Sequence, residues 1–390
     1  MFDTPMTPKL FFDRVLNGAA IGIVVGLIPN AITGELWKLL ARLFPGIDLF
    51  VTLGQVVAGL QFTVPVIVGI LIGMQFSLTA VQTVIVGTAS FVGSGAMNFT
   101  ESGVMLVGIG DLINTMITAS IAVLILVWIG DRLGSLTVLF LPVLGGGISG
   151  LLGILILPYI RWITTGIGSL VNAIAEMQGL GVFAGVLIAI IFANMIVSPI
   201  STVGVALAIG ITGPASGAAN VGIAAAAAVL MIGSLRVNNA GVTWSVFLGA
   251  MKMMMGNYLK HPIMILPLSL VAGVTGLVGA LVGITGTPAS AGFGHSGLVG
   301  PIAAAAGLDY GPFMTIVVLA LVYFVLPIGL AILVQFVGNK SGLIPASIFE
   351  FTAAGSVKSP GAADSNLDES DAKERTDAAD DTADAAPARA

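Results

Sequence analysis

Six stretches of this chain lack aspartate, glutamate, lysine and arginine, and no other feature limits the fold as strongly. They span residues 15–34, 49–100, 133–160, 177–235, 262–308 and 310–339. A helix that crosses a bilayer needs about 20 apolar residues, so the stretches of 52, 59 and 47 residues each have to fold back on themselves. Backbone in lipid has to satisfy its own hydrogen bonds, which favours helices. We therefore predict an all-α, multi-pass protein of the plasma membrane, surrounded by lipid, with about ten membrane elements and re-entrant glycine-rich hairpins.

The composition is typical of a protein whose solvent is largely lipid. Hydrophobic residues make up 57% of the chain and charged residues only 8%, whereas soluble domains carry roughly 25% charged residues. The net charge of −5 comes from 357–390, which holds nine acids and four bases, while the other ten acids and ten bases cancel. The basic surface that binds nucleic acid is absent, so we exclude nucleic acid as a partner.

Charge and hydropathy divide the chain into three predicted parts. A cytoplasmic N-terminal segment covers 1–14, a transmembrane transport domain covers 15–340, and a disordered acidic cytoplasmic tail covers 341–390. The tail has too little apolar area to offset the entropy lost on ordering. Within the middle part, 159–178 mixes charged and apolar residues, which favours a helix at the membrane interface over another span.

No motif indicates self-contained catalysis. The chain has no cysteine, two histidines, and neither a G-x-x-x-x-G-K-[ST] phosphate loop nor an H-E-x-x-H zinc motif. Thiol chemistry, ATP hydrolysis and a metal site are therefore unsupported, and we predict no cofactor. Energy for transport has to come from a gradient or from another polypeptide.

Two related glycine-rich segments interrupt the apolar sequence, namely GITGPASG at 210–217 and GITGTPASAG at 283–292. Proline cannot continue a helix, and backbone groups freed at membrane depth have to be buried in protein or face a wet cavity. Paired interruptions of this kind point to the binding site of a carrier. Two ordinary interhelical loops of low complexity would produce the same pattern.

The second segment continues as AGFGHSGLVGP, where Ser290, His295 and Ser296 stand among small residues. Their side chains and the nearby backbone N–H groups offer several donors to a hydroxylated or anionic solute. The structural alternative is a histidine that bonds to local carbonyls in a polar loop. Asn220 is the candidate ligand that follows the first segment.

Asp111 is the sharpest polar candidate inside an apolar run, in GIGDLINTM. Asn114 and Thr115 follow three and four residues later and therefore share its helical face. A carboxylate, an amide and a hydroxyl in one stripe suit the hydroxyl groups of a sugar. A buried ion pair with Lys252 or Arg236 is the structural alternative.

Asn194 is the remaining candidate for the solute site. It stands one helical turn before Ser198, and Pro199 should end or kink that helix. Lys252 lies among four methionines in GAMKMMMGNYLK, a pattern that packing explains more readily than a moving surface.

Five motifs together resemble the integral membrane enzyme IIC family of the bacterial phosphoenolpyruvate-dependent sugar phosphotransferase system. The likeness is greater to the stand-alone branch that includes perfringolysin-regulator-like proteins. The motifs are GLIPNAITGEL (26–36), GDLINTM (110–116), SPISTV (198–203), GAMKMMM (249–255) and GTPASAGFGHSGLVGP (286–301), and the resemblance covers 10–340.

The resemblance implies a homodimeric sugar carrier that holds one substrate per protomer near a re-entrant hairpin. In that family, transport is coupled to phosphorylation by a phosphocysteine or phosphohistidine on a partner domain. This chain has no cysteine and no soluble domain, so the enzyme IIB and IIA components are either separate proteins or absent. Sugar-handling relatives often have a glutamate beside the histidine of the hairpin, where this chain has Ser296. Asp111 is then the carboxylate left for a sugar hydroxyl.

We therefore predict a permease of the enzyme IIC type that binds and translocates a sugar or a similar small polar solute. As an enzyme it would be a membrane component of a sugar phosphotransferase system, and its catalytic residues are unknown. Two alternatives stay open. One is a membrane regulator that senses the ligand, and the other is a gradient-driven carrier that uses Asp111 or His295 as a proton site.

Overall fold

The computed structural model describes residues 6–101, 103–130, 132–177 and 181–351. Residues 1–5 of the predicted N-terminal segment and residues 352–390 of the predicted acidic tail lie outside these described residues. Residues 341–351, predicted as the start of the tail, continue the folded part, because three of their large apolar side chains are buried. Ile344 and Phe349 are 2% and 0% exposed, and Phe349 lies against Gly233.

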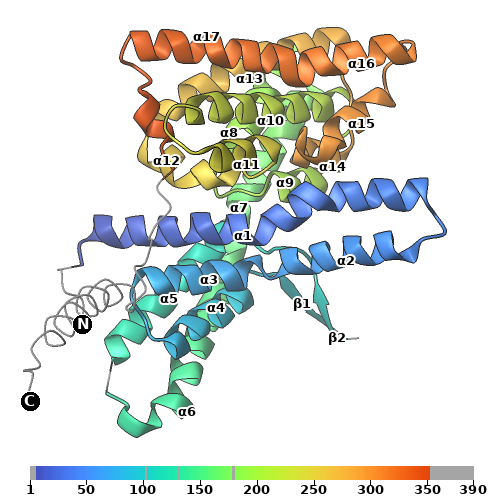
Figure 1. Ribbon diagram of the computed structural model, residues 1–390. Coiled ribbons are helices and arrows are strands. Elements are labelled where there is room, and N and C mark those ends of the chain that lie inside the picture. Colours follow the sequence, from blue (N-terminus) through green and yellow to red (C-terminus); the bar gives the residue numbers. More distant parts are fainter. Residues whose placement is uncertain (1–5, 102, 131, 178–180, 352–390) are drawn as a thin grey trace, which may run out of the picture. The chain divides into compact units, whose positions relative to one another are not determined.

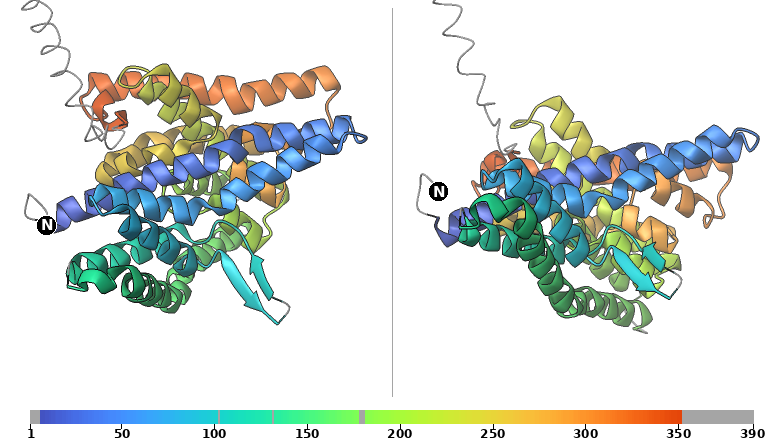
Figure 2. Two further views of the ribbon diagram at one scale, coloured as in Figure 1. Left: turned by 60° about the horizontal axis from the view of Figure 1, so that its bottom comes forward. Right: turned by 90° about the horizontal axis from the view of Figure 1, so that it is seen from below.

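The first half of the chain is helical apart from one small hairpin. Its helices are α1 (Pro8–Leu43), α2 (Asp48–Phe62), α3 (Val64–Gln75), α4 (Ala80–Gly93), α5 (Leu112–Ile129) and α6 (Thr137–Leu141). Strands β1 (Met97–Thr100) and β2 (Gly103–Leu106) pair antiparallel between α4 and α5. Figures 1 and 2 show this hairpin projecting from the helices.

The second half is also helical. Its helices are α7 (Ile148–Glu176), α8 (Val182–Val197), α9 (Thr202–Ile209), α10 (Gly213–Ser234), α11 (Ala240–Leu248), α12 (Met255–Lys260), α13 (Ile265–Val282), α14 (Pro288–Phe293), α15 (Val299–Ala305), α16 (Pro312–Ala320) and α17 (Leu326–Lys340). Two short helical turns matter for the site, η3 (Met251–Met254) and η5 (Ser296–Leu298). The all-α prediction is confirmed.

Several of these helices are long and apolar enough to cross a bilayer. The described residues contain six such helices, or seven when α2 and α3, bent by 43° at their junction, count as one span. Shorter apolar helices lie at Ala80–Gly93, Val182–Val197 and Ser296–Ala305. The multi-pass class is confirmed, while the total of about ten elements stays a prediction. The segment 159–176 is the second half of α7 rather than a separate interfacial helix.

Small residues allow the helices of the first half to pack closely. A Cβ atom added to Gly18 would lie 2.6 Å from the Cα of Ile72, and one added to Gly22 would lie 2.6 Å from the Cα of Val68. These glycines are spaced four residues apart, so they form one stripe of α1 against α3. Close backbone approach of this kind favours helix association in lipid.

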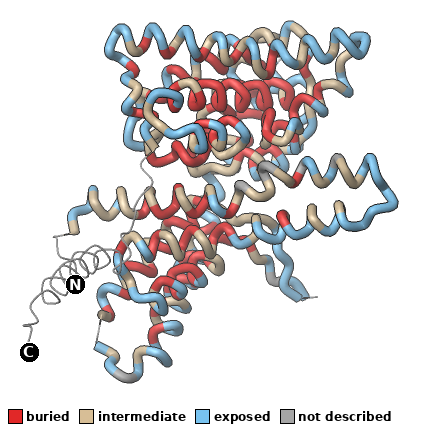
Figure 3. Tube along the Cα trace, viewed as in Figure 1, coloured by how far each residue is buried: buried red, intermediate tan, exposed pale blue. Residues whose placement is uncertain are grey.

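The buried core falls into two main groups. One lies among α1, α3, α4 and α5, and the other surrounds α10, which packs against α8, α13 and α17. Residues 216–231 of α10 are all buried (Figure 3). Helix α7 contacts both groups, through α4 and α5 on one side and α8 and α9 on the other (Figure 1).

Candidate functional site

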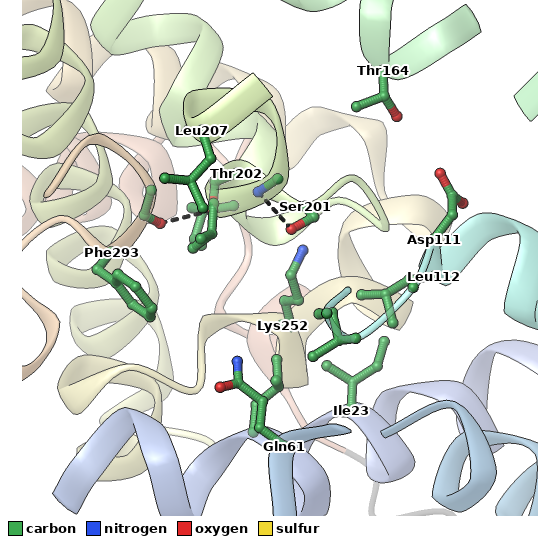
Figure 4. Close-up of a pocket in the computed structure, with 18 of the residues that line it drawn as sticks. Ile23, Gln61, Asp111, Leu112, Thr164, Ser201, Thr202, Leu207, Lys252 and Phe293 are labelled. Atoms are coloured by element: carbon green, nitrogen blue, oxygen red, sulfur yellow. Dashed lines mark hydrogen bonds between the residues drawn. The ribbon is translucent and has the colours of Figure 1, made fainter. Parts of the chain in front are cut away.

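A cavity of about 480 Å³ lies between the two groups of helices. This volume is within the range of pockets that hold small molecules. Its wall includes parts of α1, α2, the 107–112 segment, α7, α9, η3 and α14 (Figure 4). The polar side chains on this wall are Asn30, Gln61, Asp111, Arg161, Thr164, Thr165, Ser201, Thr202, Lys252 and Ser296.

Asp111 reaches the cavity because it caps the start of α5. Its side chain accepts a hydrogen bond of 2.9 Å from the backbone N–H of Asn114, as expected for an N-cap aspartate. The backbone N–H of Asp111 donates to the carbonyl of Ser94 at 2.8 Å. Arg161 of α7 and Asp111 both line the cavity.

On the other side of the cavity, Lys252 projects from η3. Its Nζ donates to the carbonyls of Ser198 and Ile200 at 2.6 and 2.8 Å. These carbonyls follow the end of α8, where Ser198 is the C-cap residue. Lys252 is only 7% exposed, so its side chain is buried at the cavity wall.

Helix α9 begins at the cavity wall. Ser201 caps it by accepting a hydrogen bond of 3.0 Å from the N–H of Gly204. The Thr202 hydroxyl donates to the carbonyl of Gly292 at 2.8 Å, and this bond connects α9 to the glycine-rich segment that contains α14 (Figure 4). The first N–H groups of a helix lack partners within it, so they are available to a ligand.

The opposite wall carries two amide side chains from α1 and α2. The Nδ2 of Asn30 donates to the Oε1 of Gln61 at 2.5 Å, and both side chains line the cavity. Asn30 follows Pro29, which lies inside α1 and supplies no N–H to the helix. The bond between the two amides does not use the Oδ1 of Asn30 or the Nε2 of Gln61.

The two glycine-rich repeats meet in space. Gly213 and Gly286 exchange backbone hydrogen bonds of 3.0 Å in both directions and form an isolated antiparallel bridge. Helix α10 begins at the first repeat and α14 at the second, each with a proline in its first turn. The repeats are therefore two halves of one structure, not unrelated loops.

Two of the seven predicted site residues line the cavity, Asp111 and Ser296. Asn114 is fully buried and donates instead to the carbonyls of Gly93 and Gly153, at 2.5 and 2.9 Å. It therefore connects α5 to α4 and α7, although it follows Asp111 by only three residues.

The other four predicted residues bond within the second half of the chain. Asn194 donates to the carbonyl of Ile190 and to the hydroxyl of Ser269. Asn220 accepts a hydrogen bond of 2.5 Å from the Tyr323 hydroxyl. Its Nδ2 also donates to the Ser290 hydroxyl at 3.4 Å.

His295 is buried beside the cavity rather than on its wall. Its Nε2 lies 2.6 Å from the carbonyl of Phe247, while its Nδ1 has no hydrogen-bond partner among the described residues. The rings of Phe247 and Phe324 pack against the imidazole. This surrounding agrees with the structural alternative of a histidine bonded to a backbone carbonyl.

Sequence reasoning missed Asn30, Gln61, Arg161 and Thr164 as cavity residues, and it favoured packing for Lys252. Asn30 and Lys252 stand inside two of the quoted motifs, GLIPNAITGEL and GAMKMMM, so the motifs contained a usable signal. Gln61 and Thr164 lie in apolar helices with no such signal. Within the described residues, no group of three or more His, Cys, Asp or Glu side chains is placed to hold a metal ion.

The chain is a multi-pass helical protein with an internal cavity, whose largely apolar wall carries ten polar side chains, as is usual for sites that bind small molecules. The family model of the phosphotransferase system EIIC matches residues 13–351, and the chain belongs to this family. It is therefore a membrane-embedded sugar permease component. No curated protein and no solved structure matches the chain.

Proposed function

We propose that this chain binds a sugar or a similar polyhydroxylated solute in the cavity and translocates it by alternating access. The main support for this proposal is the position of the cavity between the two core groups. Asn30 and Asp111 come from the first half of the chain, and Ser201 and Ser296 come from the second. A rocking movement of one group against the other would change the side from which the cavity is open.

The polar wall supports a hydroxylated solute. Asp111 supplies acceptors, Arg161 supplies donors, and Asn30 and Gln61 supply both. Ser296 lies on the wall formed by the second repeat. In this proposal Asp111 and Ser296 contact the solute. Asn114, Asn194, Asn220, Ser290 and His295 support the elements around it.

Phosphorylation, in this proposal, depends on separate enzyme IIB and IIA proteins. The chain has no cysteine to accept a phosphoryl group, and the Nε2 of His295 is engaged by the Phe247 carbonyl. The homodimer implied by the family resemblance remains part of the proposal.

Uptake by proteoliposomes that contain the purified full-length chain tests this function. The probes are radiolabelled hexoses, hexitols and hexuronates. Each is tested with and without phosphoenolpyruvate, the general phosphotransferase proteins that carry its phosphoryl group to enzyme IIA, and enzymes IIA and IIB. We expect uptake of one class, loss of uptake in Asp111→Asn, and phosphorylated product when the partners are present. Uptake of unmodified solute that a protonophore abolishes would identify the gradient-driven carrier instead. Saturable binding without uptake would identify the sensing regulator.

A further inference from the structure

The formal charges on the cavity wall do not sum to zero. Among the side chains that the structure describes, those groups are Asp111, Arg161 and Lys252. The formal charges of Asp111 and Arg161 offset each other on this wall, whereas no carboxylate of the described residues forms an ion pair with Lys252. The described wall therefore carries one cation more than it carries anions.

Lys252 still has a hydrogen-bond donor to offer. A lysine ammonium has three N–H donors, and the carbonyls of Ser198 and Ile200 account for two of them. Figure 4 shows the Lys252 side chain reaching toward Ser201, which caps the start of α9. A buried charge without a counter-ion is unfavourable, so an anionic group from the solute would stabilise this arrangement.

The start of α9 adds a second attraction for an anion at the same place. Thr202 and Val203, its first two residues, both line the cavity. Helix starts carry partial positive charge and free N–H groups. The two carbonyls that hold Lys252 belong to Ser198 and Ile200, just before this helix, so the ammonium and the helix start lie side by side.

We infer that the solute is an acidic sugar, whose carboxylate binds between the Lys252 ammonium and the start of α9. The sugar hydroxyls then face Asp111, Asn30 and Gln61 on the other walls. This inference rests on the proposed function and narrows its substrate class. A neutral hexose would leave the Lys252 charge uncompensated inside the protein.

A purely structural role for Lys252 predicts a different result from a role in binding the solute. An ammonium that only fastens the chain after α8 would affect every ligand of the cavity equally when removed. An ammonium that binds a carboxylate affects acidic ligands far more than neutral ligands. The ratio of the two affinities therefore separates these roles.

The first experiment measures binding of D-glucuronate, D-glucose and D-glucose 6-phosphate to the detergent-purified full-length chain by calorimetry. We expect glucuronate to bind at least about tenfold more tightly than glucose, because hydrogen bonds to charged groups are the stronger ones. Lys252→Gln should weaken glucuronate binding roughly 10- to 100-fold and change glucose binding little. The matched control is Lys260→Gln, since Lys260 pairs with Asp13 at 3.1 Å away from the cavity.

Each other outcome rejects the inference in a recognisable way. Equal binding of glucose and glucuronate rejects the acidic sugar and leaves the proposed function intact. If Lys252→Gln weakens the binding of glucose and of glucuronate equally, Lys252 has only a structural role. Lys252-dependent binding of glucose 6-phosphate in preference to glucuronate assigns the subsite to a phosphate. Binding of no probe rejects the inference and counts against the proposed function as well.

A second experiment probes the electrostatic potential of the cavity without altering Lys252. The chain has no cysteine, so Val203→Cys places a single thiol at the start of α9, and Val104→Cys places a control thiol on the exposed hairpin. For each thiol, we take the ratio of its reaction rate with an anionic methanethiosulfonate to its rate with a cationic one. This ratio should be at least about tenfold higher for the cavity thiol than for the control thiol. Equal ratios at the two thiols, or a cavity thiol that does not react, would overturn the inference.

Discussion

The side chains of Ser216 and Ser290 meet, with their Oγ atoms 3.3 Å apart. The two serines occupy the same position in the two glycine-rich repeats, each following the Pro-Ala of its segment. Both hydroxyls also donate to the carbonyl of Thr287, at 2.6 and 3.0 Å. Two interruptions that lie 74 residues apart in the chain therefore support each other. Their backbone polar groups are satisfied inside the protein, as lipid requires.

This contact predicts a disulfide. In a chain without native cysteine, Ser216→Cys combined with Ser290→Cys should cross-link under mild oxidation, because disulfides form between side chains this close. Intact mass should fall by two hydrogens, and proteolysis should leave the two segments joined until a reductant is added. Each single cysteine variant is the control. A double variant that stays reduced would mean that the repeats are not in contact.

Gly286→Ala should destabilise the protein. An added Cβ would lie 2.5 Å from the hydroxyl oxygens of Ser216 and Ser290 and 2.9 Å from the Nδ2 of Asn220. Overpacking of this kind costs about 1–3 kcal/mol, and thermal unfolding in detergent would measure it. Gly256→Ala is the matched control, since nothing lies within 4 Å of its added Cβ. Equal melting temperatures for the two variants would contradict the predicted crowding.

Asp111→Asn should weaken solute binding and preserve the fold. An asparagine oxygen can still cap α5 by accepting from the N–H of Asn114, and asparagine is as good an N-cap as aspartate. Loss of the charged acceptor should weaken binding roughly 10- to 100-fold. Calorimetry measures the affinity and thermal unfolding measures the fold.

The control for this variant is Asn239→Asp, which makes the reverse change at the N-cap of α11. It should leave solute binding unchanged, because Asn239 is exposed and is not on the cavity wall. Unaltered binding in Asp111→Asn would remove Asp111 from the proposed site.

Asn114→Ala should act on stability rather than on the solute. The substitution leaves the carbonyls of Gly93 and Gly153 without their donor, at a cost of roughly 1–3 kcal/mol. The remaining folded protein should bind its solute with nearly the wild-type affinity. Asn172→Ala in α7 should change stability by less than about 0.5 kcal/mol. An Asn114→Ala variant that is stable but unable to bind solute would return Asn114 to the site.

Much of the fold was predictable because lipid imposes strong constraints on sequence. Charge-free stretches of up to 59 residues leave few alternatives to packed helices, and Pro199 marks the end of α8, which the structure has at Val197. The 159–178 segment was harder to interpret. Arg161 suggested the membrane interface, yet its side chain lines the internal cavity and reaches the carbonyl of Gly95 at 3.4 Å.

The candidate site was predictable only in part, and Asp111 and Asn114 show why. Helical spacing placed both on one stripe, but Asp111 is the cap of α5 and Asn114 lies inside its first turn. The cap side chain bonds to its own helix and lines the cavity, whereas the next polar side chain reaches across to α4 and α7. A shared helical face does not specify which neighbouring element each side chain meets.

Residue order alone dictates a helical membrane protein with two paired breaks, because hydropathy and proline act locally and do not depend on distant contacts. Tertiary structure alone decides which polar groups surround a solute. It assembles Asn30, Asp111, Lys252 and Ser296 from distant segments, and it directs Asn220 and Ser290 into a buried network. Long-range packing sets those positions, since a side chain's partners depend on which helices lie beside it rather than on its neighbours in the chain.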